Sequence, residues 1–579
     1  MQGRFGSFRL RRTRERRITS LGLGHFLAVE QTGHYPDHPE LPAVRSKELA
    51  AIVAPGANHA FDLVVRAGFA HHLECRQHPE IKEELISRHG IEVPERTIGY
   101  LARKFVAYVQ VVHHESAALL RQDMICRGGY VLHVDGTCEE GSRVLLVCMD
   151  SVSGQVLDSR KIGSENAAEV QGVLEGVRDE WGVPLAAVHD LGKALFAAVP
   201  EVFPGVPQFV CHYHFAADVG KDVLGPGVDR LRKLVREVRL RPKLGAVARS
   251  LKEFAVDADG AHVLAALLDG SLPERDLPEE TGLGVVHGLV SWILAFTRAG
   301  RGYGFPFDIP YLDLYERVVA VNGLLADLPV TRRRAEDRVA RELARVRRIL
   351  APVLEGGHAP EFARVVTELR RDRKVFEALR SRLRICPRDG KHRRNDEGVP
   401  VVVNPVRHRT ILDNFRVTLR ERTTWKNGPV RACRIVLTHL DKYWLHLFGH
   451  RLEGAHGIVA PRTNNIQESG FRKVKQGCRR LHGRGHLKRE VDEMPAAAVL
   501  LQNLKRTTYR RTVYGGLGED DIAARFSEVD PAKVAAVVRS WQQDRLTCRL
   551  PRKLERTKNL PERLLGFVRA VGRTLRERA

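Results

Sequence analysis

Short runs of alternating apolar and polar residues fill the stretch from residue 130 to residue 213. The first three runs have the length and β-branched content of strands, and short turns join them. Helical and strand patterns then alternate. The pattern predicts three consecutive strands, then helix, strand, helix and strand, in the segments YVLHVDGT (130–137), RVLLVCMD (143–150), QVLDSRKI (155–162), NAAEVQGVLEGVRDEWG (166–182), LAAVHD (185–190), KALFAAVPEVF (193–203) and PQFVCHY (207–213).

The stretch before these strands, from Ser46 to His114, has a helical pattern whose last two segments predict a helix-turn-helix. Gly90 breaks the first of these helices and Pro94 opens the second. The buried stripe of the second helix is formed by Ile98, Leu101 and Phe105. We therefore expect its outward face to carry the DNA-contacting residues Arg96, Thr97, Tyr100, Arg103 and Lys104.

The remaining patterns divide the chain into further regions. Residues 1–45 are Arg-rich with little apolar period, which predicts a mobile basic arm. After Leu224 helical patterns continue for more than 200 residues. We expect a basic arm at 1–45, a helical DNA-binding region at 46–125, the first part of an α/β core at 126–224, a helical insertion at 225–455, a core helix at 456–520 and a basic helical tail at 521–579.

The net charge of the chain indicates which class of molecule it binds. The chain has 94 Lys and Arg residues against 70 Asp and Glu, a net charge of +24 and a pI near 9.9. That balance favours a polyanion, with nucleic acid the leading candidate. No apolar run of 18 residues occurs, so we expect no membrane span and a cytoplasmic, nucleoid-associated protein. Nine cysteines without a CxxC pair argue against a disulfide framework and a four-cysteine zinc site.

Two aspartates stand at the ends of predicted strands. Asp135 shares a strand face with Val131 and His133, and an acid there is costly unless it is solvated or bound to a cation. Asp190 ends LAAVHD, and the carboxyl ends of strands are where ligands usually gather. Asp135 as a turn residue and Asp190 as a solvated strand end are the alternatives.

A third acid, Glu468, lies at the start of a predicted helix. Asn464 is expected to cap this helix, with Gln467 reaching back as in a capping box. Glu468 precedes Phe471 on the apolar stripe, which points its carboxylate toward the core. The alternative is a glutamate that only favours the helix dipole. Basic residues that suit phosphate contacts lie beside it on the same helix, at Arg472, Lys475 and Arg479.

These motifs together resemble the catalytic signature of DDE transposases, in the style of bacterial insertion-sequence and Mutator-like enzymes with a helical insertion before the glutamate. The likeness covers about residues 60–560 and rests on HVDGT, HDLGKAL, a CxxH formed by Cys211 and His214, and TNNxxExxFRxxK. It implies a ribonuclease H-like core whose catalytic, metal-holding triad is Asp135, Asp190 and Glu468. The strand and helix order is also the one found in ribonuclease H-like folds. For Cys211 and His214 we expect a structural role.

This resemblance implies a two-metal phosphoryl transfer on DNA. Hard oxygen ligands select two Mg²⁺ ions, with Mn²⁺ as a substitute. The partners would be double-stranded DNA, both element ends and target, and a second copy of the chain, because synapsis of two ends needs a homodimer or larger assembly. A transposase-derived DNA-binding protein without cleavage activity and a ribonuclease H-like nuclease remain the alternative functions. Glu453 and Glu490 are the alternatives for the third acid.

Overall fold

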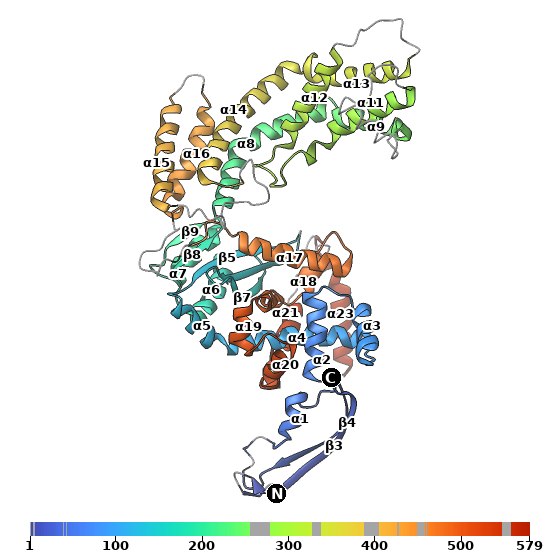
Figure 1. Cartoon of the computed structure of the whole chain (residues 1–579), viewed down its shortest axis with the longest axis vertical. Helices are drawn as coiled ribbons and strands as arrows, with labels where there is room; N and C mark the ends of the chain where they lie inside the picture. The colour runs from blue at the N-terminus through green and yellow to red at the C-terminus, as the bar shows by residue number, and fades with distance from the viewer. Residues whose placement is uncertain are drawn as a thin grey trace.

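The computed structural model describes residues 2–578 except 4–5, 8, 39, 42, 140, 255–277, 327–336, 387–403, 425–427, 449–457, 459 and 547–556. In Figure 1 a β-hairpin lies at one end of the long axis, a sheet with its helices in the middle, and a helical region at the other end. The middle part and the helical region each have a hydrophobic core of their own.

The middle part is built on a five-stranded mixed sheet with the order β7-β6-β5-β8-β9. β5 pairs antiparallel with β6 and parallel with β8, while β6 and β7 are antiparallel and β8 and β9 are parallel. The predicted order of elements is therefore confirmed, with the bounds β5 Val131–Thr137, β6 Val144–Asp150, β7 Gln155–Ile162, α6 Ala167–Trp181, β8 Ala186–His189, α7 Lys193–Val202 and β9 Gln208–Val210.

The central strand β5 is buried on both faces, and its side chains point alternately to one face and to the other. Leu132 and Val134 pack into the hydrophobic core of the middle part, which we call the first core and which also includes the N-terminal helices. Val131 lies on the opposite face, in a small cluster with Ala186, Val188 and Ala460. His133 and Asp135 share this second face with Val131, so the face that carries the candidate acid is separated from the main core.

The N-terminal helices share one hydrophobic core with the sheet, and the helix pair expected around Gly90 and Pro94 is present. Gly90 ends α3 in a left-handed conformation with φ 64°, Pro94 directly precedes α4, and the predicted stripe of α4 is at most 1% exposed. Two helices joined by a short connection are thus confirmed. The bounds are α1 Lys47–Ile52, α2 Phe61–Gly68, the π-helix η1 Phe69–Leu73, α3 His78–His89, α4 Glu95–Glu115 and α5 Ala117–Cys126.

The expectation of a mobile arm at the N-terminus is wrong, because residues 9–34 form a hairpin of β3 (Arg9–Ser20) and β4 (Gly24–His34). Arg16 is buried and its guanidinium lies 3.0 Å from a carboxylate oxygen of Glu30 on the other strand. The backbone N–H of Thr19 donates to the carbonyl of Asn58, which ties the hairpin to the helices. The sequence pattern of the Arg-rich run does not indicate a strand, because the strand that it pairs with follows only after a turn. Two shorter strands precede it, β1 Gln2–Gly3 and β2 Gly6–Ser7.

The helical region has its own core, as expected of a large insertion, but it starts earlier. Its first helix α8 begins at His212, directly after β9, and runs without a break past the expected boundary at residue 225. The described elements are α8 His212–Glu237, α9 Leu240–Ser250, η2 Lys252–Phe254, α11 Glu279–Leu294, η3 Ala295–Arg298, α12 Pro310–Ala326, α13 Arg338–Leu354, α14 Ala359–Leu383, α15 Pro405–Arg422, α16 Val430–Tyr443 and η5 Trp444–His446.

One helical stretch in the described residues, Glu279–Arg298, is long and apolar enough to cross a membrane by length and composition alone. Its side chains at Leu283, Val286 and Val290 are buried in the core of the helical region. Only 33% of this apolar window is buried, and a single helix of this kind is weak evidence for a membrane span.

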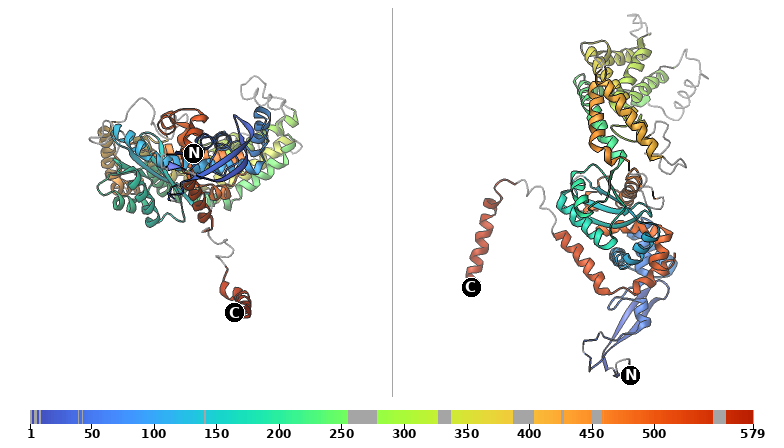
Figure 2. Two further views of the ribbon diagram at one scale, coloured as in Figure 1. Left: turned by 90° about the horizontal axis from the view of Figure 1, so that it is seen from below. Right: turned by 90° about the vertical axis from the view of Figure 1, so that its left-hand side faces the viewer.

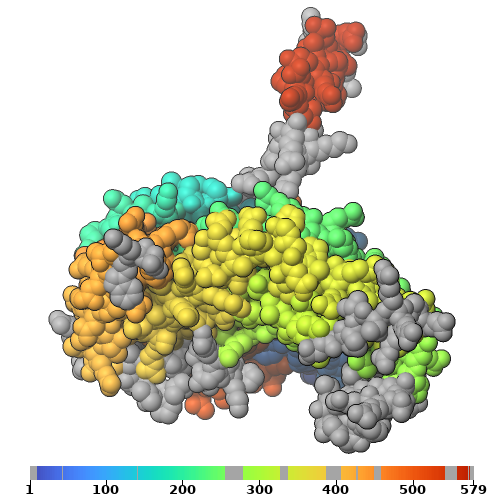
Figure 3. Space-filling view, turned by 90° about the horizontal axis from the view of Figure 1, so that it is seen from above, coloured from blue at the N-terminus to red at the C-terminus, as the bar shows by residue number. Residues whose placement is uncertain are grey.

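The C-terminal part of the chain returns to the first core, so the expectation of a basic tail from residue 521 is wrong in part. Phe526 of α20 is fully buried and stacks on Tyr108 with ring centres 4.7 Å apart, and Glu519 pairs with Arg66. Only α23 stands away from the body, as Figures 2 and 3 show. The elements are α17 Asn465–His482, α18 Lys488–Glu493, η6 Ala496–Lys505, α19 Thr507–Tyr514, α20 Glu519–Ser527, α21 Pro531–Leu546 and α23 Leu560–Arg578.

We predict that Phe526→Ala lowers the free energy of unfolding by about 3–5 kcal/mol, because it leaves a cavity between α20 and α4. Phe567→Ala is the matched control, since Phe567 of α23 is 69% exposed, and it should change stability by less than about 0.5 kcal/mol. Urea denaturation measures both. Equal effects would mean that α20 is not part of the core.

Candidate active site

Asp135 is the fifth residue of β5, and its side chain is almost completely removed from solvent, at 5% exposure. Burial, opposed by the charge of His214 and assisted by the nearby acids Asp190 and Glu165, raises the pKa of its carboxyl to about 7. An acid placed in this way is stabilised either by a proton or by a cation.

Asp190 lies beside Asp135 because their strands are neighbours. β5 and β8 run parallel with Val134 opposite His189, and the next residue along each strand is one of the two aspartates. Strands in a sheet lie about 4.8 Å apart. The Oδ1 atom of Asp190 accepts a hydrogen bond from the backbone N–H of Gly192 at 2.8 Å, which fixes one oxygen of the carboxylate.

Glu165, in the connection between β7 and α6, is a further acid that sequence reasoning missed. A methyl group added at Gly136 would lie 2.5 Å from Oε1 of Glu165, so this carboxylate reaches over the end of β5. Burial raises the pKa of Glu165, and the charge of Asp190 adds to the effect. Nothing in the local pattern at residue 165 signals this role, because the contact is made only when the sheet forms.

The start of α17 is clamped onto the sheet. Gln467 is buried, and its Nε2 donates to the carbonyls of His133, at 3.1 Å, and Val147, at 2.9 Å. His133 Nδ1 lies 3.1 Å from Oδ1 of Asn464, and since burial lowers the pKa of His133 to about 3, the neutral ring donates this bond. The backbone N–H of Asn464 donates to Sγ of Cys211 at 3.3 Å.

This arrangement corrects the capping-box prediction. Asn464 is the residue at the N-cap, but its side chain makes no capping hydrogen bond. Both polar side chains of the predicted box instead turn toward β5 and β6, because the sheet offers buried groups that need partners. The predicted helix start is confirmed, but its stabilising contacts are tertiary.

The clamp carries Glu468 to the acidic end of the sheet. Its Oε1 lies 3.6 Å from Nε2 of His214, in the first turn of α8, and the charge of His214 also acts on Asp135. His214 therefore lies between Glu468 and Asp135. The expected structural role of Cys211 agrees with its contact to Asn464, whereas His214 faces the acids and goes beyond the structural role expected of it.

In the described part of the chain, no three His, Cys, Asp or Glu side chains are grouped closely enough to hold a metal ion. The donor set nevertheless fits a hard cation, because burial raises the pKa values of the Asp135 and Glu165 carboxyls and a positive charge would relieve their repulsion. Of the alternatives for the third acid, Glu490 pairs with Arg484 at 3.0 Å, and Glu453 lies outside the described residues.

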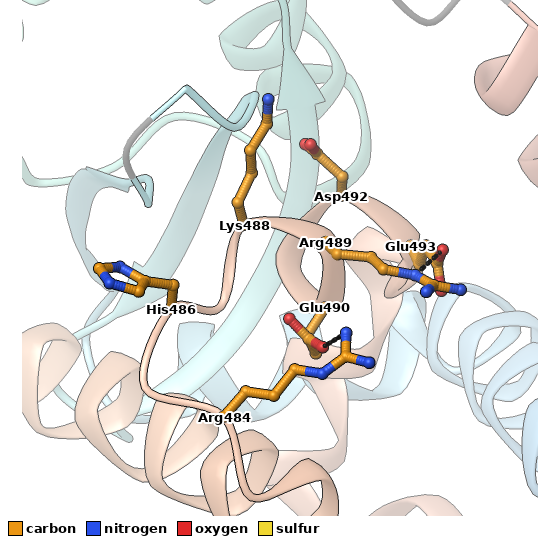
Figure 4. A pocket seen from close by; sticks show the side chains of 7 residues that line it. All are labelled: Arg484, His486, Lys488, Arg489, Glu490, Asp492 and Glu493. Atoms are coloured by element: carbon orange, nitrogen blue, oxygen red, sulfur yellow. Dashed lines mark hydrogen bonds and ion pairs between the residues drawn. The ribbon is translucent and has the colours of Figure 1, made fainter.

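The basic residues of α17 divide into two groups. Arg472 and Arg479 are exposed. Lys475 is engaged with the turn after β5, where its Nζ lies 3.0 Å from Oε1 of Glu139 and 3.2 Å from the carbonyl of Cys138. Beyond the end of α17 a pocket of about 620 Å³ is lined entirely by polar residues (Figure 4): Arg484, His486, Lys488, Arg489, Glu490, Asp492 and Glu493.

The face of α4 predicted to contact DNA is mostly exposed. Arg96, Tyr100 and Arg103 are solvent-exposed, and Thr97 is half-buried. Lys104 does not point outward as predicted. Its ammonium lies 5.7 Å from the ring centre of Tyr108, and burial lowers its pKa. The stem of Lys104 covers the aromatic cluster of α4, so this position contributes packing more than an accessible charge.

We predict that stability of the metal-free protein declines as the pH rises from about 4 to 8 through the folded pKa of Asp135, about 7. The folded-state pKa lies above the ordinary value of 3.8, so the folded protein holds a proton that the unfolded chain has lost. Asp135→Asn should therefore be more stable than the wild type by about 2–4 kcal/mol at pH 8, and by little at pH 4.

Thermal unfolding in EDTA at several pH values measures this difference. Asp179→Asn is the control, because Asp179 is 69% exposed and should show no such trend. A stability difference between Asp135→Asn and the wild type that stays constant with pH would contradict the raised pKa.

A scan against protein-family models and a search of curated proteins found no match to this chain. Its function is therefore inferred from the residues and the geometry of the site.

Proposed function

We propose that this chain is a DNA transposase of the DDE type, which cleaves transposon ends and joins them to target DNA. The observation that carries the proposal is the meeting of Asp135, Asp190 and the helix of Glu468 at one end of the sheet. The first two stand next to each other on parallel strands, and the third is clamped there through Gln467.

The architecture supports the finer assignment. Three antiparallel strands followed by two parallel strands on the other side of β5 is the arrangement expected for a ribonuclease H-like core. The helical region enters between β9 and α17, which corresponds to the insertion before the glutamate in the resembling enzymes. The pair α3 and α4 is consistent with a helix-turn-helix.

Within this proposal Asp135, Asp190 and Glu468 hold two Mg²⁺ ions, which Mn²⁺ can replace. When bound, the ions activate the attacking water or hydroxyl and stabilise the leaving oxygen. The Gly192 N–H holds one oxygen of Asp190 and leaves the other free to bind. His214 steadies the carboxylate of Glu468. A cation held by Asp135 would take the place of its proton in balancing the buried charge.

Charge supports double-stranded DNA as the substrate. The net charge of +24 favours a polyanion, and exposed arginines on α17 and α4 offer phosphate contacts near the acids and on the N-terminal helices. The hairpin adds further exposed arginines, including Arg12 and Arg14. Joining two element ends requires a homodimer or a larger assembly, and such an enzyme would work in the cytoplasm, on the nucleoid.

Two other functions use the same features. A DNA-binding protein without cleavage activity needs the basic surfaces, but it has no use for buried acids that repel one another. A ribonuclease H-like nuclease needs the acids, but the long helical region and the basic hairpin then lack a role. The transposase uses all of them, and we therefore prefer it.

We predict that Glu468→Gln abolishes cleavage of end-bearing DNA while binding of the same duplex changes less than about threefold. The substitution removes one anionic oxygen ligand but preserves the size of the side chain and the exposed Arg472 and Arg479. Cleavage in Mg²⁺ and binding by gel shift are measured on one preparation. Glu201→Gln, an exposed change on α7, is the control. Wild-type cleavage by Glu468→Gln would remove this glutamate from the site.

We also predict that reversing Arg96 and Arg103 to Glu weakens binding to element-end DNA at least about tenfold and lowers the salt dependence by about two charges. Both residues are exposed on α4. Arg88→Glu on α3, where Arg88 is 74% exposed, is the control for a charge reversal on the neighbouring helix. If the α4 variant kept wild-type affinity and salt slope, α4 would not contact DNA, and Arg12→Glu with Arg14→Glu would then test the hairpin.

A further inference from the structure

A second cluster of metal-ligating side chains lies at the other end of α17, away from the acids. One part comes from HHLECRQH, which contains His71, Cys75 and His78, and the other from CRRLH, which contains Cys478 and His482. Cys75 and His78 form a CxxH, and Cys478 and His482 form a CxxxH. The two motifs are far apart in the chain, and the fold brings them together.

The backbone presents Cys75 in an uncommon conformation. The π-helix η1 ends just before it, and Cys75 has φ 56°, in the left-handed region that a residue other than glycine rarely adopts. The N–H of Arg76 donates to the carbonyl of Ala70 at 2.9 Å, which closes the turn. Glycine would adopt this φ more easily, so Cys75 is a position to examine for a specific use of the thiol.

The two imidazoles beside Cys75 are arranged as ligands. The ring centres of His71 and His78 lie 4.7 Å apart. Nδ1 of His71 lies 3.1 Å from the carbonyl of Arg76, a contact that makes it the protonated nitrogen and leaves Nε2 as the donor for a metal. Nε2 of His78 is buried without a hydrogen-bond partner. A methyl group at Gly99 of α4 would lie 2.8 Å from this ring, so Gly99 makes room for it.

The thiol of Cys75 reaches α17 at the position of its partner motif. A methyl group on Gly477 would lie 3.1 Å from Sγ of Cys75, and Cys478 is the next residue. His482 follows Cys478 by four residues and therefore lies on the same face of the helix.

We propose that Cys75, His78 and Cys478 bind a zinc ion, with the fourth position filled by His71 or His482. Two thiolates and two imidazoles are a common tetrahedral set for structural zinc. Among the described residues these side chains do not converge on a single point, so the site requires rotation of the exposed His482 side chain and of the thiols when the ion binds. The site would join the helix of Glu468 to η1 and α3, and it does not depend on the proposed cleavage activity.

The test uses the full-length protein, stripped of metal under reducing conditions and titrated with Co²⁺ and then Zn²⁺. We expect the thiolate-to-cobalt charge-transfer absorption and the tetrahedral d–d bands to saturate at about one Co²⁺ per chain when the titration is made on Asp135→Asn with Asp190→Asn, and Zn²⁺ to displace this ion. Cys75→Ser and Cys478→Ser should each lose the charge-transfer band and weaken zinc retention at least about tenfold. Cys126→Ser, a change at an exposed cysteine, is the matched control.

Further variants complete the assignment. His71→Asn and His482→Asn are compared, and the one that supplies the fourth ligand should lose zinc retention while the other keeps it. Asp135→Asn with Asp190→Asn should retain the ion, so loss of the acidic site and loss of the zinc site are distinguished. No thiolate absorption in the wild type, or a Cys75–Cys478 disulfide by mass analysis of protein kept free of air, would overturn the proposal.

Discussion

The hydrogen bonds from the Gln467 amide to the carbonyls of His133 and Val147 are the contacts on which the candidate site depends. They join a helix near the C-terminal end of the chain to the central strands of the sheet, and they are made in the interior, where a lost partner costs about 1–3 kcal/mol. Asn464 and Cys211 complete the clamp from either side. Because Glu468 is the next residue, the position of its carboxylate is determined by bonds that it does not itself make.

Burial of the acids is the electrostatic consequence of this clamp. α17 covers the end of β5, so Asp135 is removed from water while Asp190 and Glu165 lie close by. An isolated carboxylate in such a place is costly, and the protein meets the cost with a proton or a cation. His214 and the backbone N–H groups of Gly136 and Gly192 offset part of the negative charge. The chemistry of the site therefore follows from a packing arrangement.

Sequence patterns over short windows predicted the features that depend on neighbouring residues alone. The order of strands and helices from Val131 to Val210, the stop at Gly90 and the buried stripe of α4 all follow from residue periods and turn residues. The predictions that were wrong concern contacts between residues far apart in the sequence. Asn464 and Gln467 match a capping box in sequence, yet the buried groups of the sheet compete for them successfully. In the hairpin, Arg16 pairs with Glu30 on the other strand, a contact that the Arg-rich run alone does not reveal. The position of α20 is set by packing of Phe526 on Tyr108, a residue far away in the sequence. Glu165 and His214 become functional candidates only once the sheet is formed.

α17 is attached at its two ends to different parts of the protein, and its length sets the distance between them. Its first turn is bonded to the sheet beside the acids, and its last turns lie against Cys75 and the π-helix that precedes α3. The helix spans 18 residues, about 27 Å, and joins these two parts of the protein as one continuous element. On the proposals made above, a zinc ion at the far end would fix α17 to the N-terminal helices. The two Cys-His motifs, far apart in sequence, then lie where η1 meets the helix that carries Glu468.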